Sequence, residues 1–350
     1  MKQLIERKKY MQTLRDLKDQ NIIKVITGVR RCGKSTLLQM FADELLQEGI
    51  MQEQIQFYNF EDPDIYTIGN WKEIYDYIKV RLIPDKMNYI FLDEVQNVAI
   101  FQRLVDGLYI KKNVDLYITG SNAYMLSGEL ATLLTGRYIE TSILPLQFVE
   151  YYEYMLLKSP NLSKMESLAV YVMEGGVPEY FTQKKISQKQ ADDFMKSVLQ
   201  SIIEKDIYVR LNIKNKYDFN KIIDFVFDSV GSFVSPRSIS DTLRTNGTII
   251  DKEAVARYLD ALCEVFLLYK ASRYDIKGKG LLQTLNKYYT SYYQIAWTTM
   301  TDETLERELA SLHAIKDSNP KYLLTTDLDL NPVYNGIRKL NVVDWLLLKY

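Results

Sequence analysis

The sequence contains few of the residues on which several common kinds of site depend. His313 is its one histidine, which argues against a histidine-based zinc site and a Ser-His catalytic triad. The two cysteines, Cys32 and Cys263, lie far apart in the chain. A disulfide framework is therefore not expected, and a reducing cytoplasm fits this composition.

Long apolar runs and an excess of one charge are missing as well. No apolar run approaches the roughly 20 residues of a membrane span, and residues 1–8 lack the apolar segment of a signal peptide. We therefore expect a cytoplasmic protein that does not enter a membrane. The 44 basic and 45 acidic residues give a formal net charge of -1. This sum predicts no overall attraction to nucleic acid or an anionic membrane, although it is compatible with a local basic face.

What the first 148 residues do contain is an alternation of strand and helix patterns. Short apolar and β-branched runs predict strands, and stretches with helical spacing separate them. The strands are expected at residues 22–27, 54–60, 89–93, 115–119 and 138–144, and the helices at residues 1–20, 35–46, 70–83 and 100–111. This alternation predicts an α/β core, residues 1–148, in which helices cover both faces of a parallel sheet.

The remaining sequence predicts three further domains. Residues 149–216 are mainly helical and rich in tyrosine. Residues 217–289 combine three helix patterns with a glycine-tipped hairpin, which indicates a winged helix; Ser235 suits the N-cap of its second helix and Pro236 the first helical position. Residues 290–350 predict a small α+β tail.

A glycine-bounded loop follows the first strand, at residues 28–35. Its glycines let the backbone wrap a phosphate without a Cβ in the way. Lys34 would reach the β- and γ-phosphates, and Ser35 would offer its hydroxyl to Mg²⁺. Strand, glycine loop and helix together predict a phosphate-binding loop (Walker A) for ATP, formed by Gly28, Arg30, Arg31, Cys32, Gly33, Lys34, Ser35 and Thr36.

The variable positions of this loop leave alternatives open. Arg30 and Arg31 would either add positive charge to the phosphate site or form structural salt bridges. We assign Cys32 no catalytic role.

A second motif is the apolar strand that ends in Asp93 and Glu94 (Walker B). In nucleotide hydrolases of this class the aspartate holds the metal through water and the glutamate polarises the attacking water. Strand ends of this kind often carry solvated carboxylates, but their place after a phosphate-binding loop favours the functional interpretation.

Two further candidates follow the next strands. Asn122, or as second choice Ser121, would orient the attacking water near the γ-phosphate, and the alternative is a plain turn. Arg137 would stabilise transition-state charge, within its own chain or in a neighbouring subunit, and the alternative is a structural arginine.

Several short sequence motifs together resemble those of a family of prokaryotic AAA-type ATPases with a C-terminal domain of unknown function. They are residues 24–31, 91–96, 118–123, 136–138, 144–146, 175–178 and 201–206. The resemblance implies a P-loop ATPase core, a helical lid at 149–216, a winged helix at 217–289 and a terminal domain related to restriction-type nucleases at 290–350.

The chain departs from this family near residue 290. After Lys287, Tyr288 and Tyr289 the family continues into a carboxylate motif, but here a block between about 289 and 293 is absent and Gln294 stands on the following strand. A nuclease of that type needs carboxylates near a lysine to hold Mg²⁺. We therefore predict a truncated domain without nuclease activity.

The sequence thus predicts an ATPase that uses ATP and Mg²⁺ to drive a conformational switch or the remodelling of a macromolecular partner. The alternatives are a slow-turnover nucleotide sensor and a DNA-binding protein. A protein partner is the first choice. DNA remains open through residues 235–280, with Lys252, Arg257, Lys277 and Lys279 as candidate contacts. Acidic residues on the helix that carries Lys252 and Arg257 oppose this alternative. A homo-oligomer follows if Arg137 acts on a neighbouring subunit.

Overall fold

The computed structural model describes residues 4–121, 134, 136–182, 188–209, 213, 215–229, 234–269, 292–315, 320–329 and 332–347. The chain divides into two compact units. The first contains residues 1–145 and 177–270, and the second contains residues 146–176 and 271–350. The segment at 149–216 therefore contributes to both units.

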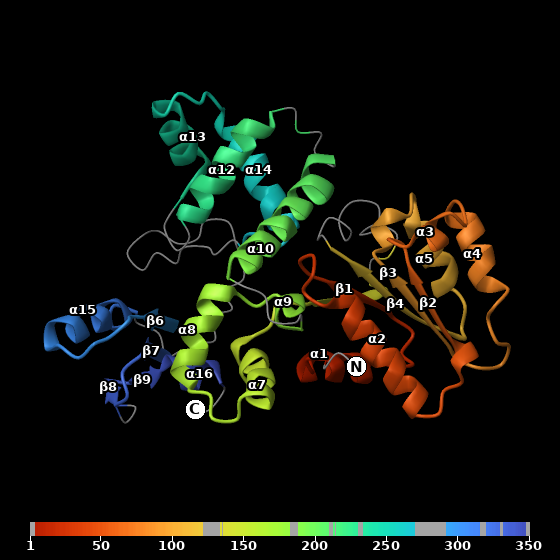
Figure 1. The fold of residues 1–350 in the computed structure, drawn as a ribbon, viewed down its shortest axis with the longest axis horizontal. Coiled ribbons are helices and arrows are strands. Elements are labelled where there is room, and N and C mark those ends of the chain that lie inside the picture. The colour runs from red at the N-terminus through yellow and green to blue at the C-terminus, as the bar shows by residue number, and fades with distance from the viewer. Residues whose placement is uncertain are drawn as a thin grey trace. The chain divides into compact units, whose positions relative to one another are not determined.

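The first unit is built on a five-stranded parallel sheet, ordered β2-β3-β4-β1-β5 (Figure 1). Its strands are β1 (Ile23–Thr27), β2 (Ile55–Asn59), β3 (Asn88–Asp93), β4 (Val114–Gly120) and β5 (Tyr138–Ser142). Each lies within two residues of its predicted bounds, and the predicted α/β fold class is confirmed.

Alternate side chains of the sheet enter two separate apolar clusters, because successive residues of a strand face opposite sides. Tyr89, Phe91 and Tyr117 pack with helices α1 and α2, whereas Ile90 and Leu116 pack with α4 and α5. The elements around the sheet are α1 (Lys8–Leu17), α2 (Lys34–Gln47), η1 (Gln52–Gln54), α3 (Pro63–Tyr66), α4 (Trp71–Lys79), η2 (Val95–Asn97) and α5 (Phe101–Tyr109).

Strand β4 lies between β1 and β3. Because all three strands are parallel, the loops that follow them meet at one edge of the sheet. Open α/β sheets bind ligands at this carboxyl edge.

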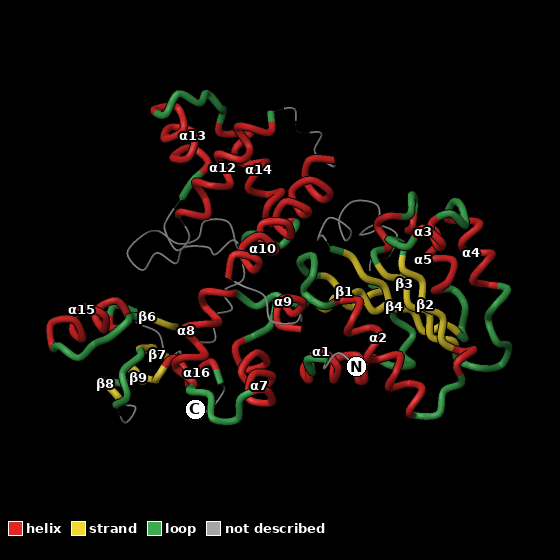
Figure 2. The backbone as a smooth tube through the Cα atoms, in the orientation of Figure 1, coloured by secondary structure: helices red, strands yellow, loops and turns green. Residues whose placement is uncertain are grey.

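The rest of the first unit is helical in its described part (Figure 2). Its elements are α9 (Pro178–Thr182), α10 (Gln188–Ile202), the π-helical segment η4 (Ile203–Tyr208), α12 (Lys216–Asp228), α13 (Pro236–Thr245) and α14 (Lys252–Glu264). Helix α13 begins where predicted, because the Ser235 hydroxyl accepts a hydrogen bond from the backbone N–H of Ser238. The predicted wing, with Lys277 and Lys279, lies outside the described residues.

The second unit contains a mixed sheet ordered β6-β7-β9-β8, in which only the β8–β9 pair is antiparallel among the described strands. Its elements are α7 (Phe148–Lys158), α8 (Lys164–Glu174), β6 (Tyr292–Ile295), α15 (Asp302–His313), β7 (Lys321–Thr325), β8 (Val333–Tyr334), β9 (Ile337–Asn341) and α16 (Val342–Leu346). The described part of the tail thus combines four strands with the helices α15 and α16, in keeping with the α+β pattern predicted from sequence. Within the described parts of the chain, no helix is long and apolar enough to span a membrane.

Candidate functional site

The loop between β1 and α2 adopts a conformation that requires glycine at both ends. Gly28 has a φ of 149°, and a Cβ there would lie 2.2 Å from the carbonyl oxygen of Ile143. Gly33 has a φ of 99°, in the left-handed region that favours glycine. The two positions therefore wrap the loop around the start of α2, where a helix N-terminus favours an anion.

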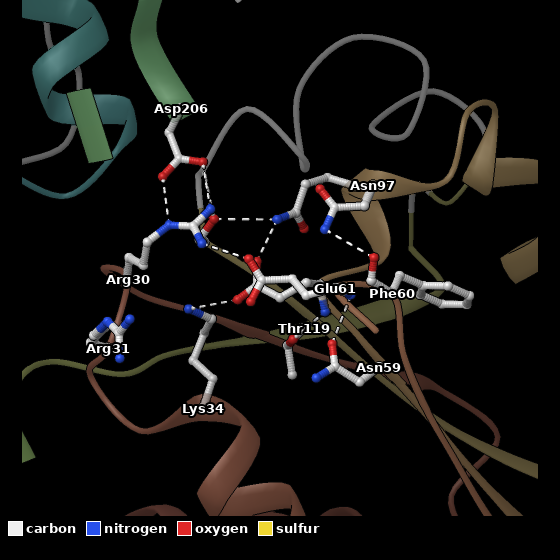
Figure 3. A network of polar contacts seen from close by, with 12 residues as sticks. Arg30, Arg31, Lys34, Asn59, Phe60, Glu61, Asn97, Thr119 and Asp206 are labelled. Carbon is white, nitrogen blue, oxygen red and sulfur yellow. Dashed lines mark hydrogen bonds and ion pairs between the residues drawn. The ribbon is translucent and has the colours of Figure 1, made fainter. Parts of the chain in front are cut away.

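Lys34 is the first residue of α2, and its ammonium group is turned into the site. The side chain is buried, with Nζ 3.1 Å from the carbonyl oxygen of Gly28 and 3.3 Å from Oε1 of Glu94. Figure 3 shows Lys34 directed at the carboxylate cluster beyond the loop. A bound phosphate would give this ammonium group an alternative anionic partner.

Glu94 follows β3 with a φ of 53°, a left-handed conformation that is uncommon for a residue with a side chain. Its carboxylate interacts with Lys34 through Oε1 and accepts a hydrogen bond from Gln96 Nε2 at Oε2. Burial alone would raise its pKa, but Lys34, Gln96 and Arg30 hold the pKa of Glu94 below its ordinary value. The carboxylate is therefore ionised and able to accept a proton at neutral pH.

Thr119 on β4 links the two carboxylates that end β3. Its hydroxyl donates a hydrogen bond to Oδ1 of Asp93 and accepts one, 2.9 Å long, from the backbone N–H of Glu94. Because β4 lies beside β3, this single buried threonine fixes both neighbouring residues.

Asp93 also interacts with the side chain of Ser35, the second residue of α2. Burial and the nearby Glu94 raise the pKa of Asp93, while hydrogen bonds from Thr119 and Ser35 oppose that rise. A hydroxyl beside a carboxylate is the donor set that Mg²⁺ uses in nucleotide sites, where phosphates and waters supply its other ligands. This fits the described residues, which contain no cluster of three or more acidic, histidine or cysteine side chains able to hold a metal alone.

Arg30 forms ion pairs in this structure. Its guanidinium group donates to both carboxylate oxygens of Asp206, each at 3.2 Å, and to Glu61 at 2.6 Å (Figure 3). Burial would lower its pKa, but Asp206 and Glu61 raise the pKa of Arg30 above its ordinary value. The side chain therefore joins the phosphate-binding loop to the π-helical segment η4.

The other predicted loop residues lie at the margin of this network. Arg31 pairs with Glu179 on α9 and takes no part in the interactions of Figure 3. Cys32 is fully buried, and burial raises the pKa of its thiol, which keeps it neutral. Thr36 is exposed on the first turn of α2.

Ser121 is buried after β4, beside Gln96 and Asp206. Its hydroxyl oxygen accepts a hydrogen bond from Gln96 Nε2 at 3.2 Å and lies 3.5 Å from Oδ1 of Asp206. Asn122, the first choice for orienting water, lies outside the described residues, so its role stays a prediction.

Arg137 lies away from the other predicted site residues. It precedes β5, and its carbonyl oxygen accepts a hydrogen bond from the backbone N–H of Ile23 at the start of β1. It is therefore at the amino edge of the sheet, whereas the loop and Glu94 are at the carboxyl edge. Its guanidinium group pairs with Asp106 at 2.8 Å. This pairing fits the structural alternative for Arg137, and its role at a γ-phosphate stays a prediction.

Four residues of the site received no role from the sequence. Gln96, Thr119 and Asp206 belong to motifs that carried the family resemblance, so their position in those motifs was an available signal. Glu61 lies in a loop after β2 and had no such signal. Its position is fixed by a hydrogen bond from its backbone N–H to Oδ1 of Asn59.

A pocket of about 730 Å³ adjoins this network. Its walls include Arg30, Glu61, Lys205 and Asp206 but not Lys34. The pocket therefore lies beside the phosphate-binding loop, and its lining combines charges of both signs.

Two family models match different parts of the sequence. Residues 20–152 match a family model described as an AAA domain, and residues 165–292 match a domain of unknown function (DUF8612). The AAA domain implies nucleotide binding. The predicted resemblance to AAA-type ATPases with a C-terminal domain of unknown function is thereby confirmed, whereas the winged-helix and nuclease-like descriptions of that domain stay predictions.

Two relatives and one solved structure extend this comparison. An uncharacterized protein of Haemophilus influenzae is 37% identical over 289 residues, which are 82% of this chain and 72% of that protein. An uncharacterized protein of Methanocaldococcus jannaschii is 28% identical over 271 residues, which are 75% of this chain and 59% of that protein. A Walker-type ATPase of Pyrococcus abyssi has a TM-score of 0.50 at 16% identity, covering 75% of this chain and 90% of that one. The last comparison shows a shared fold.

Proposed function

This chain belongs to the AAA-domain family that includes the uncharacterized Haemophilus influenzae relative, and from that premise we propose that it hydrolyses ATP with Mg²⁺. The proposed reaction converts ATP and water to ADP and phosphate. The resulting change in the site would drive a conformational switch or the remodelling of a macromolecular partner.

The buried contact between Lys34 and Glu94, 3.3 Å apart, carries this proposal. It brings a phosphate-binding cation and a potential general base to the same edge of the sheet. Asp93, the last residue of β3, lies at the same edge and accepts a hydrogen bond from the hydroxyl of Thr119. A phosphate-binding loop alone would support binding; these carboxylates support hydrolysis.

The proposed roles follow from the chemistry of each group. Lys34 binds the β- and γ-phosphates in place of its contact with Glu94, and the backbone N–H groups of the loop surround the phosphate oxygens. Mg²⁺, held by Ser35 and through water by Asp93, would neutralise charge on the phosphates. Glu94, released from Lys34, accepts a proton from the attacking water.

ATP turnover by the wild type and by Glu94→Gln tests this function. The amide keeps the size of the side chain but cannot accept the proton, so we expect turnover to fall by about 10²-fold or more while ATP stays bound. Glu48→Gln, at an exposed carboxylate paired with Lys18, is the matched control and should leave turnover unchanged. Equal turnover by the wild type and Glu94→Gln would contradict the proposal.

A slow-turnover nucleotide sensor is the second candidate, and one observation favours it. Both carboxylate oxygens of Glu94 are engaged, one by Lys34 and one by Gln96. If ATP does not displace Lys34 from Glu94, the base stays occupied. In that case the wild type and Glu94→Gln would bind ATP equally and turn it over equally slowly.

For the macromolecular partner we propose a protein, with DNA as the alternative through residues 235–280. Exposed cations on α13 and α14 have acidic neighbours, because Arg237 lies 3.8 Å from Asp241 and Lys252 lies 3.7 Å from Glu253. Such neighbours repel phosphates. A gel-shift series against salt decides between the partners: retardation at about 50 mM salt that weakens steeply with added salt would favour DNA.

A further inference from the structure

The carboxamide of Gln96 is fixed against the proposed base. Its Nε2 donates one hydrogen bond to Oε2 of Glu94 and another, 3.2 Å long, to Oγ of Ser121. An ionised carboxylate can only accept hydrogen bonds, so the nitrogen of the carboxamide must face Glu94. This orientation also determines where the carboxamide oxygen points.

The oxygen of the same group has no partner among the residues that the structure describes. Oε1 of Gln96 is buried and makes no hydrogen bond within the described part of the chain. Buried carbonyl oxygens of side chains normally accept at least one hydrogen bond, and an exception calls for an explanation. Because Nε2 of the same carboxamide donates to Glu94, Oε1 of Gln96 lies close to the proposed base.

The local backbone holds Gln96 in this position. The left-handed conformation of Glu94 starts η2, and the next residue, Val95, is fully buried. Asn97, at the end of η2, donates from Nδ2 to the carbonyl oxygen of Phe60 at 3.3 Å. Gln96 thus stands between two anchored residues.

We propose that Gln96 is a positioning residue for ATP hydrolysis, which holds Glu94 through Nε2 and orients the attacking water through Oε1. The inference rests on the proposed ATPase function. One hydrogen of the water would be hydrogen-bonded to Gln96 Oε1, and the other would pass as a proton to Glu94 Oε1. The water oxygen bonds to the γ-phosphorus while the bond from that phosphorus to the β–γ bridging oxygen breaks, and ADP leaves with the electron pair.

The test compares Gln96→Leu with a matched control. Leucine retains similar bulk but neither donates to Glu94 nor accepts from water, so we expect kcat to fall by at least about tenfold, with KM for ATP changed by less than about threefold. Gln102 on α5 also carries a buried Oε1 without a partner in the described residues, so Gln102→Leu makes the same chemical change elsewhere. We expect kcat of Gln102→Leu to match the wild type. A kcat of Gln96→Leu within about twofold of the wild type would overturn the proposal.

Gln96→Glu serves as a second variant in case Gln96→Leu does not fold. If Gln96→Leu shows no cooperative thermal unfolding, Gln96→Glu replaces it. This variant has the same shape and an acceptor, but its carboxylate repels Glu94 instead of holding it. We again expect a fall in kcat of about tenfold with KM little changed, and an unchanged kcat would again count against the proposal.

A crystal structure of the wild type with ADP, aluminium fluoride and Mg²⁺ separates this proposal from the ATPase function. We expect the in-line water within about 3.2 Å of Gln96 Oε1, and a water without that contact would overturn the role of Gln96. Absence of turnover by the wild type would refute the ATPase function instead. Turnover that Gln96→Leu leaves intact would refute only the inference.

Discussion

The ammonium group of Lys34 lies 3.3 Å from a carboxylate oxygen of Glu94, with both side chains buried. The two residues come from different strand ends, one after β1 and one after β3, and they neutralise each other in a part of the protein that excludes water. A phosphate that binds Lys34 must therefore compete with Glu94. Under the proposed function, nucleotide binding and release of Glu94 as the base would be one event.

Replacing Lys34 tests that exchange. Lys34→Met removes the ammonium group that would bind phosphate, and it also leaves Glu94 buried without its cation. We expect the dissociation constant for Mg-ATP to rise by about 10²-fold, or nearly 3 kcal/mol, measured by calorimetry. Lys72→Met, at an exposed ion pair with Asp76 on α4, should leave it unchanged. An affinity of Lys34→Met within about threefold of the wild type would rule out phosphate binding by Lys34.

Arg30 and Asp206 should depend on each other energetically. Their two hydrogen bonds are largely buried, and removing Arg30 alone would leave Asp206 buried beside Ser121. In a double-mutant cycle with Arg30→Ala and Asp206→Ala, measured by urea unfolding, we expect a coupling free energy of about 1–3 kcal/mol. If the losses in the free energy of unfolding of the two single variants are additive, the contact between Arg30 and Asp206 adds no stability.

Much of the sheet and its binding edge was predictable from the sequence. Strands β1 and β3 are short, largely apolar runs followed at once by Gly28 and by Glu94, so the sequence indicates both their extent and the loops that carry Lys34 and Glu94. These are local properties of the chain. The family resemblance extended them to the segment that contains Asp206.

Long-range neighbours were not predictable in the same way. The sequence did not indicate that β4 separates β1 from β3, which is what places Thr119 between Asp93 and Glu94. It gave no indication that Arg30 would meet Asp206, since that contact depends on how α10 and η4 pack. For Arg137 a signal existed, because a residue that precedes a parallel strand lies at the amino edge of the sheet.

Breaking the buried ion pair between Lys24 and Asp115 at that amino edge should destabilise the first unit strongly. Both side chains are 1% exposed, and Asp115 also accepts a hydrogen bond from the hydroxyl of Tyr117 at 2.8 Å. Asp115→Ala leaves Lys24 uncompensated, so we expect the free energy of unfolding to fall by about 3–5 kcal/mol. The double variant Lys24→Met with Asp115→Leu should recover part of this loss in urea unfolding. A double variant no more stable than Asp115→Ala would show that the unpaired charge is not the cause.

Arg137 offers a test of whether the site is shared between chains. Because it pairs with Asp106 at the amino edge, Arg137→Ala should change turnover by less than about twofold in dilute protein. Turnover per chain is measured against protein concentration for the wild type and the variant. A deficit of Arg137→Ala that grows as concentration rises would indicate that the arginine acts in a neighbouring subunit.

Asp327 should make the stability of the second unit depend on pH. Its carboxylate is paired with Lys339 at 2.8 Å and accepts hydrogen bonds from the side chain of Thr298 and from both the backbone N–H and the hydroxyl of Thr299. Burial alone would raise its pKa, but Lys339 and the two threonines hold the pKa of Asp327 well below its ordinary value of 3.8. Folding therefore favours the ionised carboxylate.

The lowered pKa of Asp327 determines how the stability of the second unit changes with pH. A carboxyl whose pKa is lower in the folded state contributes its full stability above the unfolded pKa and loses it as pH falls through the folded pKa. The stability advantage of the wild type over Asp327→Asn should therefore be constant between about pH 5 and 7 and shrink below about pH 4. Urea unfolding followed by the fluorescence of Trp297 and Trp345, in a Trp71→Phe background, measures it for this unit. An advantage that stays constant down to about pH 3 would mean that Asp327 acts through its hydrogen bonds and not through its charge.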